Sequence, residues 1–564
     1  MATINTYSKR FFPDRNTDYA PQEVIHINIP PDQCVLLNGK DSYVRCTVKL
    51  NCALLAKLDP FAGGHALFDY IQIYSGDGSA LLEELRQNAS WHGIRMYYDD
   101  CEGLRNKRQL LEGKDGDTVR QSIRNGYSMY YDNPVGTALV TPQSFRDVEL
   151  CIPLYNSGVL YGDRAFPVIA TQGIQLRLYL SSAEQAITFP NVPGLVTKRD
   201  RTPGLPALTD LANDLSTAVL GPAPQDNLNG PIGRCFSLRT ALAAGNTTQV
   251  DVMLETSASI VPAQPTAGLA VNVKATASST TAPLYCGITP GMHLAYVNGA
   301  GAVQDCGLIT GVAFSAPNIL RFTVGAFTAT VAAAGVSVFA YIPQANSAVD
   351  FKVSNVEFFA SCVEPDEGFY AEMERGLKAE GGMNFDIMSF NVTRNNLQAS
   401  NTVQDELIAL TARRARALMQ FTFAPIPSPF RSYFRPVADF LRSYQHIIHD
   451  MRVPQLAVDT DREFQLGETG FNPLCDDERH KLLTSSKIDV KNETEPANCF
   501  VMGRRLAMRG HSFDANADSL RTTVTYGIQD GANLITAQEN KLLVTYCRHF
   551  RRIVCTPTVV RVEY

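Results

Sequence analysis

The sequence predicts an all-β chain of two tandem sandwiches, with a small β insertion in the first sandwich and a few short helices. Three observations support this prediction. Apolar and polar residues alternate in short segments that recur along most of the chain, as expected for strands with one buried face. Gly, Pro, Asn and Asp separate these segments, as turns require. A stretch with almost no charge, residues 246–343, interrupts the first block.

Length and composition indicate several globular units. The chain has 564 residues, of which 45% are hydrophobic and 19% charged, and roughly 150 residues per domain suggests three or four compact units. The net charge of -6 and the pI near 5.9 exclude a protein whose whole surface binds nucleic acid, because such binding needs Lys and Arg to neutralise phosphates. Local basic patches are still compatible with this net charge.

Cysteine usage and the amino terminus favour a reducing compartment. The thirteen cysteines are scattered singly without a C-x-x-C pair, and the first residues, MATINTYSKRFFPDR, lack an apolar signal core. We therefore expect buried thiols. Without a secretion signal, the four N-x-S/T sequons are expected to be chance matches; they begin at Asn88, Asn246, Asn391 and Asn492.

Strand and turn signals are densest in residues 148–187. Two apolar runs, Val148 to Leu154 and Ala165 to Ala170, flank turn residues at 156–158 and 162–163, which is typical of strands joined by a tight loop. From Ile174 to Leu180 every second residue is apolar, so one face can meet a core while the other meets water.

Before this stretch, residues 1–20 lack a periodic apolar face and are expected to form an arm that orders only against a neighbour. Strands are predicted at Val24 to Ile29, Val44 to Leu50 and Ala66 to Tyr74. After the turn at 75–78, the run Leu81 to Leu85 is predicted to be helical.

The middle of the chain departs from this pattern. Residues 189–233 are Pro-rich and indicate a long surface excursion. Only five of the 98 residues in 246–343 are charged, which favours a compact β insertion. Residues 322–349 carry no charge and are long enough to span a bilayer, but their β-branched residues and Gly335 favour a hairpin.

Strand patterns return after residue 349. A strand is predicted at Phe351 to Phe359 and a helix at Phe369 to Ala379, because Pro365 and neighbouring acids mark a helix start and Gly381-Gly382 its end. Residues 384–564 are expected to form the second sandwich. Its predicted strands lie in 417–423, 499–508, 520–526, 542–547 and 553–562.

These motifs, in this order, resemble double jelly-roll major capsid proteins, especially those of virophages, polinton-like viruses and adintoviruses. In the first roll the resemblance lies in Pro153-Leu154 followed by Phe166-Pro167, in the strand and Gly-rich turn at 66–78 with the predicted helix from Leu81, and in Ser354-Asn355-Val356 before a helix. In the second it lies in Ser443-Tyr444-Gln445 with the downstream Pro454, in Gly510-His511-Ser512, and in the two closing segments 543–546 and 559–564.

The resemblance implies a domain plan and a function. The plan is an arm at 1–20, a first jelly roll at 21–383 interrupted by 190–345, and a second jelly roll at 384–564. The implied function is a non-enzymatic major capsid protein that forms trimeric pseudo-hexagonal capsomers tiling an icosahedral shell around a DNA genome. The resemblance also implies that each roll is an eight-stranded sandwich. Loops between strands are expected to form the outer towers, with residues 246–343 contributing most, and the termini are expected to lie near the inner face. Implied partners are copies of the chain, a penton protein and minor capsid proteins, in a virion assembled from protein made in the host cytoplasm.

No catalytic, cofactor-binding or metal-binding residue is predicted. His446 and His449 would share a face on a helix, but on the predicted strand they point in opposite directions. The acidic clusters Asp99-Asp100 and 476–478 are typical of solvated loops, and Lys114 to Asp117 lacks the further acids of a calcium loop. We predict structural or surface roles for all of these residues.

Three basic clusters, at 198–201, 413–416 and 548–552, are candidates for contact with a genome or an anionic membrane at the inner face; salt bridges between subunits or solvation are equally compatible with them. No sequence-specific nucleic-acid binding is expected. The alternative function is a β-sandwich carbohydrate-binding or glycan-cleaving protein. Trp91, the only tryptophan, counts against it, because sugar sites usually stack on aromatic platforms.

Overall fold

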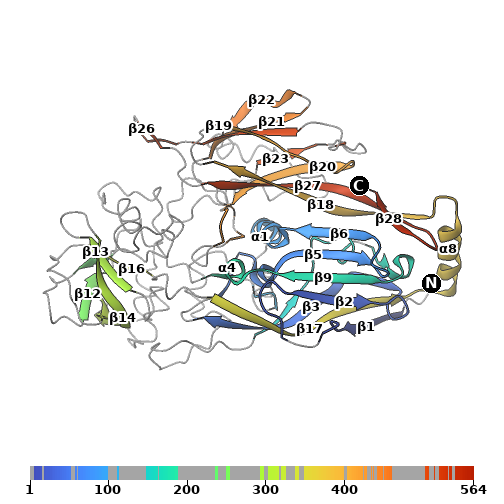
Figure 1. The fold of residues 1–564 in the computed structure, drawn as a ribbon, viewed down its shortest axis with the longest axis horizontal. Helices are drawn as coiled ribbons and strands as arrows, with labels where there is room; N and C mark the ends of the chain where they lie inside the picture. Colours follow the sequence, from blue (N-terminus) through green and yellow to red (C-terminus); the bar gives the residue numbers. More distant parts are fainter. Residues whose placement is uncertain are drawn as a thin grey trace.

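The fold is seen in a computed structural model (Figure 1). It describes residues 5–15, 18–52, 57–59, 61–99, 111–113, 148–162, 164–188, 236–238, 249–253, 293–297, 303–316, 319–324, 337–341, 349–398, 403–423, 425–427, 433–434, 436, 441–448, 450–459, 502–506, 514, 520–526, 528–530, 533–535 and 540–563.

The first unit consists of two antiparallel sheets. One has the strand order β1-β17-β3-β7, with β8 paired to β3, and the other has the order β2-β9-β5-β6. Alternation explains the packing, because every second side chain of β9 is buried. The strands are β1 (Asn5–Phe11), β2 (Val24–Ile29), β3 (Leu36–Cys52), β5 (Phe68–Ser75), β6 (Leu81–Arg86), β7 (Val148–Ile152), β8 (Phe166–Pro167), β9 (Ile174–Leu180) and β17 (Val349–Glu364).

The second unit repeats this arrangement. Its sheets have the orders β18-β27-β20-β23, with β28 paired to β27, and β19-β24-β21-β22. A buried polar chain joins the two sheets: the Gln420 amide donates to Thr545, Thr522 donates to Gln420, and His446 contacts Thr522. The strands are β18 (Met383–Leu397), β19 (Val403–Leu407), β20 (Ala415–Phe423), β21 (Leu441–Ile448), β22 (Met451–Asp459), β23 (Met502–Arg505), β24 (Leu520–Tyr526), β27 (Lys541–Cys555) and β28 (Val560–Glu563).

Both units follow one topology. If the eight main strands of each unit are counted in chain order, the two sheets of each have the orders 1-8-3-6 and 2-7-4-5. This is the strand order of a jelly roll. The chain is a double jelly roll. The predicted fold class is therefore confirmed by the pairing of the strands themselves.

A third unit lies between β9 and β17. Six strands form a closed barrel in the order β11-β12-β15-β14-β13-β16, shown apart from the rolls in Figure 1. Asp251 and Arg321, two of the few charged residues of this segment, form a bidentate ion pair across β12 and β15. The strands are β11 (Phe236–Leu238), β12 (Gln249–Met253), β13 (His293–Val297), β14 (Val303–Ala316), β15 (Ile319–Val324) and β16 (Ser337–Tyr341).

The predicted hairpin in 322–349 is wrong. β15 pairs with β12 and β14, whereas β16 pairs with β11 and β13, so the two strands are not neighbours. Among the described residues, no helix is long and apolar enough to cross a membrane.

Other local predictions also need correction. Leu81 to Leu85 is strand β6, not a helix, because it pairs with β5. Part of the expected arm, Asn5–Phe11, is the edge strand β1 paired with β17. Only Phe166–Pro167 of the second apolar run is strand, followed by the 3-10 helix η2 (Val168–Thr171), and β7 and β8 both pair with β3 rather than with each other. The segments predicted at 542–547 and 553–562 are largely one strand, β27, followed by the short β28.

The helices lie at the ends of the rolls and between them. α8 (Glu367–Lys378) follows β17 and precedes β18, and Asp366 caps it by accepting from the Phe369 amide, close to the predicted start. α1 (Asn88–Asp99) and β6 lie on the side of the first roll that faces β18 and β28 (Figure 1). Smaller elements are β4 (Lys57–Leu58), η1 (Gly63–Leu67), α4 (Ala183–Ala186), β10 (Ile187–Thr188), β25 (Ile528–Asp530) and β26 (Asn533–Ile535).

Candidate functional site

The contact between the two rolls is centred on an aromatic side chain from the first. Trp91 of α1 is buried, and its ring lies 5.0 Å from Phe390, 5.4 Å from Tyr546 and 6.5 Å from Phe421 of the second roll, measured between centroids. Such tilted aromatic contacts stabilise beyond the area they bury. Because Trp91 is buried here, it is not available as a sugar-stacking platform in this structure.

Polar contacts surround the aromatic cluster. The Tyr546 hydroxyl donates to the Gln87 carbonyl at 3.3 Å, and burial raises the pKa of the Tyr546 phenol well above its ordinary value. Arg551 Nη1 donates to the Leu82 carbonyl at 3.0 Å. The β5–β6 pairing shifts register between Ile73/Glu83 and Tyr74/Leu81, so Leu82 lies in a β-bulge. A bulge redirects the backbone, and here the carbonyl of Leu82 accepts a hydrogen bond from Arg551 of the second roll.

The same bulge buries Glu83 beside Leu82. Glu83 accepts from the Ser157 hydroxyl at 2.6 Å and from the amides of Gly158 and Val159 at 3.0 and 3.3 Å. These hydrogen bonds hold the 156–158 turn that the sequence indicated, and Gly158 of this turn lies close to β18. A Cβ added at Gly158 would lie 2.3 Å from the Met388 carbonyl oxygen, so the rolls approach too closely here for any other residue.

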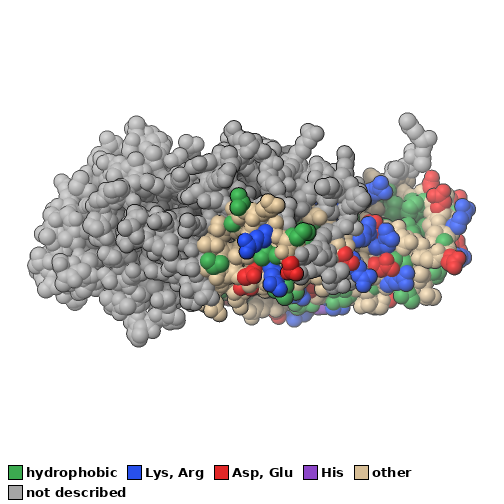
Figure 2. All heavy atoms as spheres, turned by 90° about the horizontal axis from the view of Figure 1, so that it is seen from above, with side chains coloured by type: hydrophobic (Ala, Val, Ile, Leu, Met, Phe, Trp, Pro, Cys, Tyr) green, Lys and Arg blue, Asp and Glu red, His purple; other side chains and the backbone are tan. Residues whose placement is uncertain are grey.

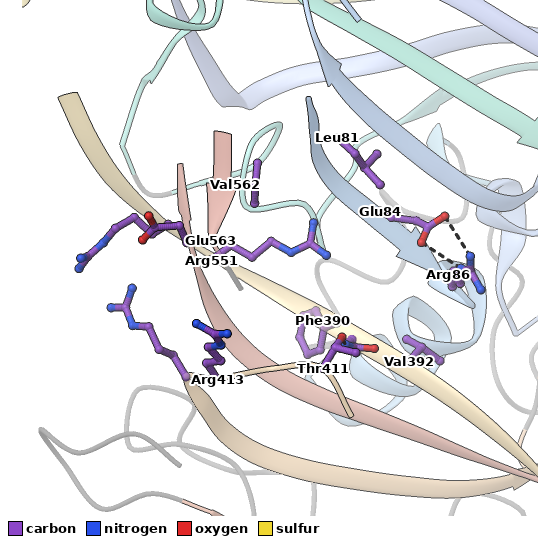
Figure 3. Close-up of a pocket in the computed structure, with 13 residues that line it drawn as sticks. Leu81, Glu84, Arg86, Phe390, Val392, Thr411, Arg413, Arg551, Val562 and Glu563 are labelled. Atoms are coloured by element: carbon purple, nitrogen blue, oxygen red, sulfur yellow. Dashed lines mark hydrogen bonds and ion pairs between the residues drawn. The ribbon is translucent and has the colours of Figure 1, made fainter. Parts of the chain in front are cut away.

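A cavity of about 1000 Å³ lies beside this contact (Figure 3). It brings together two of the predicted basic clusters, because β20 pairs with β27 and residues 413–416 thus lie beside residues 548–552. The sequence could not show this juxtaposition. The lining residues are Leu81, Glu84, Arg86, Phe390, Asn391, Val392, Thr411, Arg413, Arg414, Arg551, Arg552, Val562 and Glu563.

Most of the arginines of the cavity are bound within the chain. Arg414 makes two hydrogen bonds of 2.8 Å to Asp386, and Arg552 adds one of 3.1 Å. The Arg414 guanidinium, with help from Arg552, lowers the pKa of the Asp386 carboxyl to about 2, although burial opposes this. Arg86 pairs with Glu84. Within the described part of the chain, Arg413 has no ion pair and is exposed. Four of the five arginines that line the cavity are therefore held by partners within the chain, and the fifth, Arg413, is exposed.

The other predicted candidates are not gathered here. His446 lies on β21, as predicted, and is a buried core histidine. Asp99 ends α1. Residues 100, 114–117, 198–201, 449 and 476–478 lie outside the described residues. Sequence reasoning missed one cluster, formed by His65, His92 and Glu112, because these residues are far apart in sequence and have no recognisable ligand spacing.

The outer sheet of the second roll exposes apolar side chains on both edge strands. Val403 and Leu407 of β19, and Met451 and Leu456 of β22, are all more than half exposed. Seen from above, the described surface intermixes hydrophobic, basic and acidic side chains rather than presenting one sign of charge (Figure 2). Apolar residues on exposed edge strands favour contact with other chains.

The comparisons with known proteins give structural similarity only. No protein-family model matches the sequence, and no curated protein matches it. The chain is similar to the solved Faustovirus major capsid protein, with 8% identity, coverage of 99% of this chain and 91% of that chain, and a TM-score of 0.48. It is also similar to the Sputnik virophage structure (7% identity, 98% and 89% coverage, TM-score 0.42) and to the mavirus major capsid protein (8% identity, 99% and 90% coverage, TM-score 0.34).

Proposed function

We propose that this chain is a viral major capsid protein whose copies tile a shell. One observation carries the proposal: two sandwiches of identical strand order lie in one chain and are joined by a buried aromatic and hydrogen-bonded contact. A subunit that packs into a lattice can be built from two similar domains that are joined firmly to each other, and such a subunit needs no active site. The domain plan we propose is a first roll that starts with β1 and extends to residue 382, interrupted by 190–345, and a second roll that starts with β18 at Met383.

The proposed capsomer is a homotrimer. Three chains supply six similar blocks, so a closed three-fold ring has a pseudo-hexagonal outline. The exposed apolar residues of β19 and β22 support contacts between chains. The barrel of β11 to β16 stands apart from the rolls (Figure 1), as a tower projecting from the shell would.

The proposed location is the virion, with the protein made in the host cytoplasm and assembled around a DNA genome. Proposed partners are neighbouring capsomers, a penton protein and minor capsid proteins. The arginine clusters contribute little to genome contact in this proposal, because Arg414 and Arg552 are engaged by Asp386 and Arg551 by Leu82. Among the described arginines of the clusters at 413–416 and 548–552, Arg413 is exposed and is best placed to meet a phosphate.

Light scattering on the purified full-length chain tests the proposal. A capsomer has three times the chain mass of 61.8 kDa, roughly 185 kDa. A monomer at all concentrations, with a thermal shift on adding glycans, would contradict the capsomer and favour the carbohydrate-binding alternative. Addition of a non-binding polymer of similar size controls for crowding in the glycan experiment.

A further inference from the structure

Two histidines and one glutamate meet inside the first roll. His65 lies in η1, His92 in α1, and Glu112 in the short described segment 111–113. All three are buried, and one candidate ligand atom from each lies within 4.8 Å of the other two. Imidazole nitrogen and carboxylate oxygen are ligands for zinc and similar ions.

The separations fit a shared ion better than direct hydrogen bonds. Glu112 Oε2 lies 3.5 Å from His92 Nε2 and 3.7 Å from His65 Nε2, whereas N–H···O bonds are usually about 2.7–3.2 Å long. Bonds of about 2.0–2.1 Å in a tetrahedral site hold neighbouring ligand atoms roughly 3.3–3.4 Å apart. The two histidine–carboxylate separations exceed that spacing by only a few tenths of an ångström, and the ligand atoms of the three residues all lie within 4.8 Å of one another.

Buried polar atoms of His65 and Glu112 have no partner within ordinary hydrogen-bond geometry among the described residues. These atoms are both ring nitrogens of His65 and the Oε2 oxygen of Glu112. Their side chains are 0% and 4% exposed. Leaving buried polar atoms unpaired costs about 1–3 kcal/mol each, and more for a charged group. A bound cation removes this cost for the carboxylate and for the imidazole nitrogen that faces it.

A second layer orients the carboxylate. The Tyr155 hydroxyl donates to Glu112 Oε1 at 2.5 Å, and the Gly64 amide donates to the Glu112 carbonyl at 2.6 Å. Oε1 is thus occupied, and Oε2 is left to face the imidazoles. Metal sites depend on such outer partners to aim their ligands. The His65 and His92 rings stack with centroids 3.6 Å apart and planes 24° apart, so binding requires a further tilt that aims both nitrogens at one ion.

We propose that His65 Nε2, His92 Nε2 and Glu112 Oε2 bind one divalent transition-metal ion of the Zn²⁺ class, with water as the fourth ligand. The ion ties η1, α1 and segment 111–113 together. His92 follows Trp91 directly, so the ion also fixes the helix that carries the central aromatic residue of the contact between the rolls. This inference goes beyond the shell role and does not depend on it.

Metal content and binding test the proposal. The full-length chain is stripped with a chelator, titrated with Zn²⁺ and washed, and its bound metal is measured by mass spectrometry. One saturable equivalent per chain is expected. With Co²⁺ as the probe, visible absorption of a four-coordinate site is expected. At free Zn²⁺ of 100 times the Kd, the folded-to-unfolded ratio rises about 100-fold. No saturable equivalent in the stripped wild-type chain would overturn the proposal, even if no variant folds.

Variants locate the site. Glu112→Gln and His92→Gln are expected to lose the single bound metal ion per chain and the stabilisation by zinc. His549→Gln is the matched control, because His549 is an equally buried histidine in the second roll, and it is expected to retain both. The assignment of the metal ligands would be overturned if Glu112→Gln still bound one metal ion per chain, or if His549→Gln bound none. An assembly experiment that fails while the metal binds would contradict the proposed shell role alone.

Discussion

Arg551 in β27 donates a 3.0 Å hydrogen bond to the backbone carbonyl of Leu82 in β6, and both residues are buried. They are 469 positions apart in the sequence. The bulge at Leu82 leaves that carbonyl outside the β5–β6 ladder, so its partner is a side chain of the other roll. This bond is shorter than two other hydrogen bonds that link the sandwiches, from Tyr546 to Gln87 and from Gln172 to Pro557, which are each 3.3 Å long.

Replacing this arginine tests the link. Arg551→Leu leaves the Leu82 carbonyl without that bond, and we expect a loss of about 1–3 kcal/mol in the free energy of unfolding. Urea denaturation followed by Trp91 fluorescence measures it, because Trp91 is the only tryptophan and lies at the contact. Arg561→Leu is the control: its side chain is 64% exposed and pairs with Glu563 at 3.5 Å, so we expect a loss of less than about 1 kcal/mol. Equal losses in the two variants would contradict the link.

Trp91→Ala is expected to destabilise the chain most. Removing a buried indole leaves a cavity among Phe390, Tyr546 and Phe421, and such truncations cost about 3–5 kcal/mol. Circular dichroism during urea denaturation measures the loss, since the variant has no tryptophan. Phe12→Ala serves as the comparison, because Phe12 is 64% exposed and its loss is expected to stay within about 0.5 kcal/mol. An unchanged midpoint for Trp91→Ala would show that the rolls do not depend on this contact.

Gly158→Ala is expected to force the rolls apart. The added Cβ meets the Met388 carbonyl oxygen at 2.3 Å, and backbone atoms cannot move aside as a flexible side chain can, so we expect a cost of about 1–3 kcal/mol or more. In Gly376→Ala, within α8, the nearest atom is 3.9 Å away, and alanine's helix propensity predicts a gain of up to about 1 kcal/mol. Thermal unfolding of the two variants compares them. A stable Gly158→Ala would mean that the two backbones do not approach as closely as described.

His549 predicts a specific dependence of stability on pH. Burial, with the nearby charge of Arg551, lowers the pKa of His549 to about 4 from its ordinary 6.5. The folded chain therefore keeps the imidazole neutral while the unfolded chain takes up a proton. Above pH 6.5 His549 is neutral in both states and does not reduce the free energy of unfolding. As the pH falls from 6.5 to about 4, protonation of the unfolded chain lowers the free energy of unfolding by roughly 3 kcal/mol.

The difference between wild type and His549→Gln isolates this effect, because every other titrating group is common to both. Unfolding free energies between pH 7 and 4 should fall more steeply in the wild type. If the unfolding free energies of the two proteins changed in parallel with pH, the lowered pKa of His549 would be contradicted.

Much of the fold could be predicted from residue patterns. β2, β9 and β24 match their predicted bounds, because each has one buried face and turn residues at its ends. β6 could not be assigned from Leu81 to Leu85. These residues favour a helix when read locally, but pairing with β5 and the burial of Glu83 by the 157–159 turn decide the strand. Tertiary contacts outweigh intrinsic propensity here.

The site was harder to predict than the fold. The basic clusters at 413–416 and 548–552 were recognised, but their position beside each other depends on the pairing of β20 with β27. The binding of Arg414 and Arg552 by Asp386 depends in addition on β18, which pairs with β27. His65, His92 and Glu112 come from three separate segments, and only the folded chain brings them together. Trp91 has no strand or motif context that indicates its place between the rolls.

Electron microscopy of the purified chain tests the central claim most directly. Class averages are expected to show a three-fold particle with six similar lobes, since each of three chains contributes two jelly rolls. Single particles with two lobes at every concentration, or two-fold dimers, would contradict the account of this chain as a shell-forming tile.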